Sequence, residues 1–119
     1  MSDKNRKAFY VTTPIYYLSG TPHIGTAYTS IAADVLARFH ACDGEKVKFL
    51  TGTDEHGLKV LRCAEKETME PQAYCDREVE KFKAFKDLLN LSYDDFIRTT
   101  EERHKSAAQA IWNKLNDAG

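Results

Sequence analysis

Cysteine, proline and long hydrophobic runs are all scarce in this sequence of 119 residues. The three cysteines, Cys42, Cys63 and Cys75, form no CxxC pair, which predicts reduced, scattered thiols and excludes a disulfide framework or zinc knuckle within the chain. No apolar run has the length that crosses a bilayer, which excludes a transmembrane helix and a membrane partner. The formal net charge is −1, so no broad basic face for RNA is implied, and no DNA partner is expected.

The composition that remains is that of one small globular domain. Hydrophobic residues make up 42% of the chain and charged residues 29%, and no repeat, low-complexity tract or linker divides it. Residues 1–7 contain no apolar segment, so they are not a secretory signal, and we expect a flexible leader. A cytoplasmic location is expected. Import into a mitochondrion or another organelle is the alternative, against which Asp3 and the shortness of the leader argue.

One stretch near the N-terminus predicts a strand, a loop and a helix in succession. Residues 9–13 are aromatic or β-branched, which favours a strand. Pro14 has no amide donor and ends regular pairing, and residues 19–22 are dense in turn formers. Apolar residues then recur every three or four positions, which predicts an amphipathic helix that begins at His23. They are Ile24, Tyr28, Ile31, Val35, Phe39 and Cys42.

The start of that helix predicts a nucleotide site. The free amides of a helix N-terminus attract phosphate. His23 stands at this point, and Gly25 allows a ligand to approach the backbone closely. The spacing is neither that of GxGxxG nor that of a Walker motif.

A second strand, around Val47–Leu50, ends at Thr51–Thr53. Strand, helix and strand within about forty residues predict a βαβ unit with parallel pairing. The two strands then end near each other, at residues 13–14 and 53–54. Ligands of open α/β sheets bind outside the carboxyl ends of the strands, so we expect one shared site there.

The second half of the chain predicts three helices and a third strand. A helix over residues 57–66 is expected to face inward with Leu58, Leu61 and Ala64, and Pro71 suits the first turn of the next helix. That helix should bury Cys75, Val79, Phe82, Phe85 and Leu89. Residues 93–99 form the expected strand, Thr99 and Glu102 fit a capping box for the last helix, and Gly119 is its expected stop.

Three motifs together resemble one family. They are the sequences TPIYY at residues 13–17, PHIG at 22–25 and TGTDEHG at 51–57. They resemble the N-terminal part of methionyl-tRNA synthetase, a class I aminoacyl-tRNA synthetase, and the resemblance covers nearly the whole chain after Lys7. His23, Ile24 and Gly25 are similar to the first three letters of the HIGH signature. The fourth position is Thr26, where the family usually has histidine.

The resemblance implies an α/β fold: a Rossmann-like parallel sheet with helices packed on it. Residues 8–119 would be the first, HIGH-bearing half of the catalytic domain, and the rest of that domain would be the partner of this chain. The implied reaction activates methionine with ATP, accompanied by Mg²⁺, to methionyl-adenylate and then charges tRNA(Met). Any structural zinc would lie outside this chain. A lysine-bearing KMSKS-like loop has no counterpart here, so we expect the isolated chain to bind ATP weakly and to activate little methionine.

The resemblance also implies roles for single residues. His23 and Thr26 would be catalytic, and Pro22, His23, Gly25 and Thr26 would bind ATP. The methionine-binding residues would be Pro14, Ile15, Tyr17, Asp54 and His56.

The residues themselves leave other roles open. His23 or Asp54 could be an ordinary helix cap, Thr26 a helix-start threonine, and His56 a residue that holds its loop. A metal held by Asp54, Glu55 and His56 is not expected, because adjacent side chains diverge. For the whole chain, the alternatives are another synthetase or nucleotidylyltransferase with the HIGH signature, and a non-catalytic, synthetase-like module that binds a nucleotide or a partner.

Overall fold

The computed structural model describes residues 7–119, so the predicted leader lies outside the described residues except for Lys7. Four strands form one sheet: β1 (Ala8–Thr12), β2 (Tyr16–Tyr17), β3 (Lys46–Asp54) and β4 (Asp95–Arg98). All three of the other strands pair with β3, and every pairing is parallel. The βαβ unit and its parallel pairing are therefore confirmed.

The short strand β2 was not expected, because the sequence predicted a loop after Pro14. Phe9 pairs with Val47 and Tyr16 pairs with Thr53, so β2 resumes the pairing of β1 along β3 with the register displaced by one residue. Pro14 interrupts the ladder because it lacks an amide donor. The two tyrosines after it fit a pleated sheet well enough to pair again.

A close approach of β3 and β4 depends on Gly52. Gly52 is the register partner of Ile97. A β-carbon added at Gly52 would lie 2.0 Å from the backbone oxygen of Ile97. Only glycine fits this position without moving one of the two strands.

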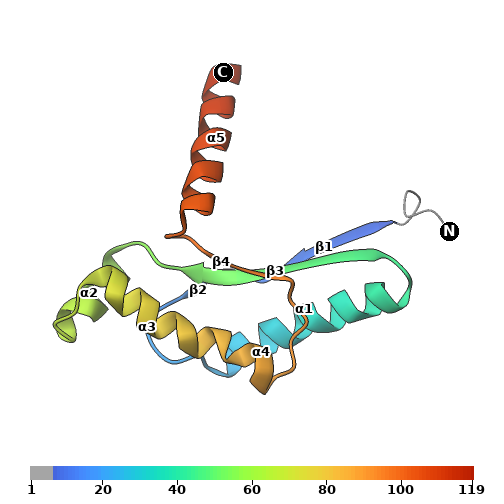
Figure 1. Ribbon diagram of the computed structural model, residues 1–119, viewed down its shortest axis with the longest axis horizontal. Helices are drawn as coiled ribbons and strands as arrows, with labels where there is room; N and C mark the ends of the chain where they lie inside the picture. The colour runs from blue at the N-terminus through green and yellow to red at the C-terminus, as the bar shows by residue number, and fades with distance from the viewer. Residues whose placement is uncertain (1–6) are drawn as a thin grey trace.

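Within the described residues, five helices accompany the sheet. They are α1 (Ile24–Cys42), α2 (Leu58–Lys66), α3 (Pro71–Lys83), the short α4 (Phe85–Leu88) and α5 (Glu102–Ala118). Figure 1 shows α1 to α4 on one side of the sheet, while α5 projects from the opposite side. No helix in residues 7–119 is long and apolar enough to cross a membrane.

Helix α1 faces the sheet with its small and polar residues. The buried residues of this helix are Thr26, Ser30, Ala33, Asp34 and Ala37. The apolar stripe that predicted the helix points away from the sheet: Ile24 is 86% exposed and Phe39 is 64% exposed. Small residues allow α1 to lie close to the sheet, and Asp34 is satisfied there by the backbone and side chain of Ser92. Within the described part of the chain, no element covers the stripe.

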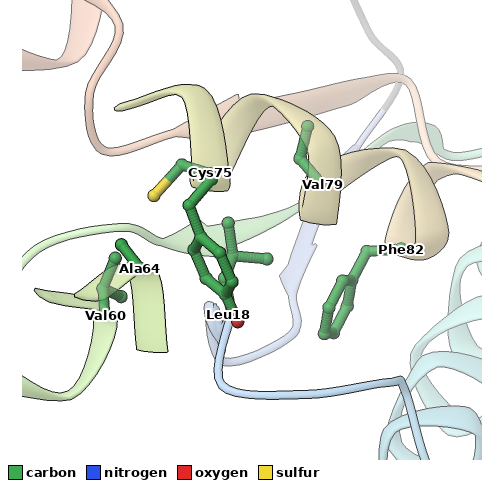
Figure 2. Close-up of a cluster of buried hydrophobic side chains, with 7 residues drawn as sticks. Leu18, Val60, Ala64, Cys75, Val79 and Phe82 are labelled. Carbon is green, nitrogen blue, oxygen red and sulfur yellow. The ribbon is translucent and has the colours of Figure 1, made fainter. Parts of the chain in front are cut away.

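Two apolar clusters form the core. In the first, Leu18 is fully buried at the centre of residues from α2 and α3, as Figure 2 shows. In the second, Phe49 of β3 packs against Ala33 and Ala37 of α1 and against Tyr93. The first cluster fixes the loop after β2, and the second fixes α1 on the sheet.

Several expected details of the second half are confirmed and others are wrong. Pro71 starts α3 as expected, and the three cysteines are free. On α2, Ala64 is buried as expected, but Leu58 and Leu61 are exposed and Val60 is buried instead. Val60 and Ala64 pack with residues of α3 in one apolar cluster, and the two leucines are not part of it.

The helix around residues 71–89 is divided. Its predicted inward residues Cys75, Val79 and Phe82 are buried. However, α3 ends at Lys83, Ala84 follows as its cap, and Phe85 belongs to α4 and is only half-buried.

The predicted capping box of the last helix is absent. Glu101 is the N-cap of α5, and its side chain makes no capping hydrogen bond. The hydroxyl of Thr99 instead accepts a hydrogen bond from the backbone of Glu55, at 2.9 Å. A tertiary contact has therefore replaced the local one that the sequence pattern favoured.

Candidate functional site

The loop between β2 and α1 is held at both ends. Leu18 is 0% exposed within the first apolar cluster. The hydroxyl of Tyr16 lies 3.0 Å from that of Ser30 on α1, and the hydroxyls of Thr13 and Thr51 are 2.6 Å apart. These contacts fix the chain on both sides of residues 19–22 and so fix where α1 begins.

His23 caps the N-terminus of α1. Its ring nitrogen Nδ1 accepts a hydrogen bond from the amide of Gly25, at 3.0 Å. Because Nδ1 is the acceptor, the proton of a neutral ring sits on Nε2, which is then a donor for a ligand. The cap and the ligand-facing role are therefore compatible, since they use different ring nitrogens.

A hollow of about 490 Å³ opens in front of this cap. Five predicted site residues line it: Ile15, Tyr17, His23, Gly25 and Thr26. Pro14, Pro22, Asp54 and His56 are not among its lining residues. Residues that sequence reasoning missed complete the lining: Tyr16, Ser19, Gly20, Thr21, Thr29, Lys59 and Phe82.

Thr26 occupies a more enclosed place than its neighbours. It is 6% exposed, and it borders both the large hollow and a small one of about 10 Å³. The small hollow is about the size of one water molecule. An imidazole at this position would have no space on the inner side and would have to point into the large hollow.

Lys59 is the lysine of the hollow, and its position was not predicted. It lies in the first turn of α2, and its Nζ is 5.5 Å from the centre of the Tyr17 ring. A cation over an aromatic face is attracted by it. The sequence gives no signal for this contact, because Tyr17 and Lys59 meet only after β2 pairs with β3.

Asp54 ends β3 beside Tyr17, its register partner on β2. It does not cap α2, because the N-cap is Gly57, with a φ of 102° that favours glycine. The helix-cap alternative for Asp54 is therefore excluded. The structure thus brings together two residues predicted to bind methionine, Tyr17 and Asp54, at the carboxyl end of the sheet.

The side chain of His56 holds the loop after β3. Its Nδ1 lies 3.1 Å from the hydroxyl of Thr99, and that hydroxyl accepts a hydrogen bond from the backbone amide of Glu55. His56 is exposed, so the ring remains accessible on its other side.

Glu55 also lies in this loop, and the sequence predicted no role in binding or catalysis for it. Its carboxylate accepts hydrogen bonds from Thr53 at 2.6 Å, from Thr100 at 2.6 Å, and from two nitrogens of Arg98 at 2.7 and 2.9 Å. Burial would raise the pKa of Glu55, but the bonds from Arg98, Thr100 and Thr53 outweigh it and hold that pKa below its usual range. The carboxylate is therefore ionised and fully satisfied.

Metal binding at this loop does not fit these contacts. The oxygens of Glu55 are occupied by four donors. Among the residues that the structure describes, no group of three or more His, Cys, Asp or Glu side chains could hold a metal ion.

Comparison with known proteins assigns the family. The sequence pattern of the family described as tRNA synthetases class I (M) matches residues 9–119. The methionine–tRNA ligase of Rickettsia typhi is 51% identical over 114 residues, which is 96% of this chain and 22% of the relative. Methionine–tRNA ligase 1 of Bacillus cereus is 51% identical over 119 residues, which is 18% of its length.

A solved structure gives the same result. Mycobacterium tuberculosis methionyl-tRNA synthetase in complex with methionyl-adenylate is 44% identical, with a TM-score of 0.91 over 95% of this chain and 22% of that one. The chain thus spans about a fifth of the length of these relatives. The Rossmann-like α/β fold and the resemblance seen in the sequence are both confirmed. On its matched sequence and its fold, this chain belongs to the family of class I tRNA synthetases (M).

Proposed function

We propose that this chain is the part of a methionine–tRNA ligase that binds ATP and methionine and forms methionyl-adenylate. In this reaction the methionine carboxylate attacks the α-phosphorus of ATP, and pyrophosphate leaves. The methionyl group then passes to tRNA(Met). The remainder of the catalytic domain, with its lysine-bearing loop, would be the partner of this chain.

The observation that carries the proposal is the geometry of His23. Nδ1 accepts a hydrogen bond from the amide of Gly25 at 3.0 Å, which fixes the ring and leaves Nε2 free to donate, and His23 lines the hollow. Negative charge grows on the phosphoryl oxygens and on pyrophosphate during activation. A fixed donor at a helix N-terminus stabilises that charge more in the transition state than in the ground state.

The nucleotide is proposed to lie along Pro22, His23, Gly25 and Thr26, as Mg²⁺–ATP. Thr26 has a hydroxyl that can donate one hydrogen bond to phosphate, but it carries no positive charge. Lys59 is a cation on the wall of the same hollow.

Methionine is proposed to bind beside the nucleotide. Ile15 and Tyr17 line the hollow, with Pro14 just before them, and such walls suit an apolar, polarisable thioether. Asp54 lies beside Tyr17 and would pair with the α-ammonium group. His56, in the loop that follows Asp54, would border the same site.

The test is methionine-dependent ATP–pyrophosphate exchange by the full-length protein. We expect His23→Ala to slow exchange by roughly 100- to 1000-fold, the usual cost of losing one transition-state donor, with the fold retained because His23 is exposed. The matched control is His104→Ala, a histidine on α5 outside the hollow, which should leave the rate unchanged. Near-normal exchange by folded His23→Ala would refute the catalytic role.

A second variant tests the methionine side. Asp54→Asn keeps the shape and removes the charge, so the KM for methionine should rise far more than the KM for ATP. Asp117→Asn on α5 is the matched control. Equal losses for both substrates would show that Asp54 supports the loop rather than the ligand, and exchange that depends on leucine or valine instead would assign another synthetase.

A further inference from the structure

A fully buried carboxylate stands between two residues that are proposed to bind methionine. The side chain of Glu55 is 0% exposed, whereas its neighbours Asp54 and His56 are half-buried and exposed. Backbone geometry therefore turns Glu55 into the protein while its two neighbours stay at the surface. The proposed reaction assigns no direct role to Glu55.

The partners of Glu55 come from two strands. Thr53 precedes it at the end of β3, whereas Arg98 ends β4 and Thr100 follows it. Arg98 also bonds Asp76 on α3, at 2.6 Å. One carboxylate thus joins the carboxyl ends of two parallel strands, and the arginine continues the connection to a helix. The amide of Glu55 bonds Thr99 as well, so both the backbone and the side chain of this loop residue are held.

Stability alone does not account for such an arrangement. Removing two charges from water is costly, and a buried ion pair often contributes no more stability than apolar residues of the same volume. What the pair does provide is a defined geometry, because the two-nitrogen fork of an arginine fits a carboxylate in one orientation. That geometry acts on the end of β3, which carries Asp54, and on the loop after it, which carries His56.

We propose that Glu55 is a positioning residue for amino-acid binding: through Arg98 and Thr100 it fixes the loop after β3 so that Asp54 faces the substrate. The inference rests on the proposed function, because it takes Asp54 as the partner of the ammonium group. It adds a residue that touches no substrate and acts through its neighbour.

The variant is Glu55→Gln, which preserves the shape but places an amide donor against the donors of Arg98 and Thr100. The matched control is Glu78→Gln. Glu78 is a second buried carboxylate, 3% exposed, and its ion pairs are with Arg77 and Lys81 on α3 rather than with residues of the loop after β3. Both variants remove one buried charge, so both should lower the melting temperature.

Only Glu55→Gln should change substrate binding. In the full-length protein we expect its KM for methionine to rise about tenfold or more, since small displacements of a binding group are costly, while its KM for ATP stays within twofold. Glu78→Gln should leave both KM values within twofold. In addition, hydrogen exchange of the amides in residues 54–57 should accelerate in Glu55→Gln and not in Glu78→Gln.

Two results would overturn the inference while leaving the proposed function intact. One is a folded, active Glu55→Gln variant whose two KM values change equally or not at all. The other is unchanged hydrogen exchange in residues 54–57. A wild-type protein without methionine-dependent exchange would overturn the proposed function and this inference together.

Discussion

Replacing Gly25 by alanine would displace the His23 ring without removing it. The new β-carbon would lie 2.9 Å from Cε1 and 3.1 Å from Nδ1 of His23. Carbon atoms in contact normally sit about 3.5 to 4.0 Å apart, so the ring must move by about 0.6 Å or more. The bond between Nδ1 and the amide of residue 25, 3.0 Å long, would be lost or bent.

The stability of the protein should change little. Loss of a helix cap costs about 1 kcal/mol, while alanine in place of glycine within a helix contributes up to about 1 kcal/mol. These two effects oppose each other, so the net change in the free energy of unfolding should be within about 1 kcal/mol. In the full-length protein, the proposed adenylate formation should nevertheless slow by about 100-fold, because displacing a catalytic group by about 1 Å can cost that much.

The assay is methionine-dependent pyrophosphate exchange combined with thermal unfolding, on the Gly25→Ala, His23→Ala and double variants of the full-length protein. If the methyl group acts only through the ring, the double variant should be no slower than His23→Ala alone, since effects on one interaction do not add. Additive losses with a raised KM for ATP would show instead that the methyl group blocks the nucleotide. A normal rate in Gly25→Ala would refute the role of the cap geometry.

Three further outcomes are expected. Gly52→Ala should destabilise the protein by about 3 kcal/mol in urea unfolding, because its methyl would lie 2.0 Å from a backbone oxygen of β4; a loss below about 1 kcal/mol would mean that the strands separate easily. The pKa values of Glu55 and Glu78 are lowered by hydrogen bonds that outweigh burial. The two ionised carboxylates therefore stabilise the folded protein fully above about pH 4.3, the ordinary glutamate value, and this stabilisation is lost as the pH falls through the lowered pKa values. Unfolding free energies that are flat from about pH 5 to 2 would contradict this. Burial raises the pKa of Cys75 to about 11, so a thiol reagent at pH 8 should label exposed Cys42 and spare Cys75 until the protein unfolds; equal labelling rates would contradict the burial.

The elements around the candidate site could be predicted from the sequence, because they depend on residues that are neighbours in the chain. The aromatic and β-branched run before Pro14, the turn residues after it and the helical period beyond His23 place a strand, a loop and a helix without reference to distant residues. The same holds for the strand that ends at Asp54. The family motifs lie at these junctions because the carboxyl ends of parallel strands meet there. His23, Gly25 and Tyr17 accordingly line one hollow.

Contacts between distant residues decided the rest. The period of α1 shows that it has an apolar side, but only packing shows that Ser30 and Ala33 face the sheet while Phe39 does not. Thr99 fits a capping box by sequence, yet it bonds a loop 44 residues earlier in the chain.

Glu55 illustrates the same limit at the candidate site. Its partner Arg98 is 43 residues away, and no local pattern connects the two. A sequence reveals periods, turns and motifs because these depend on neighbouring residues. Which face is buried, and which charge meets which, depends on how the strands align in three dimensions.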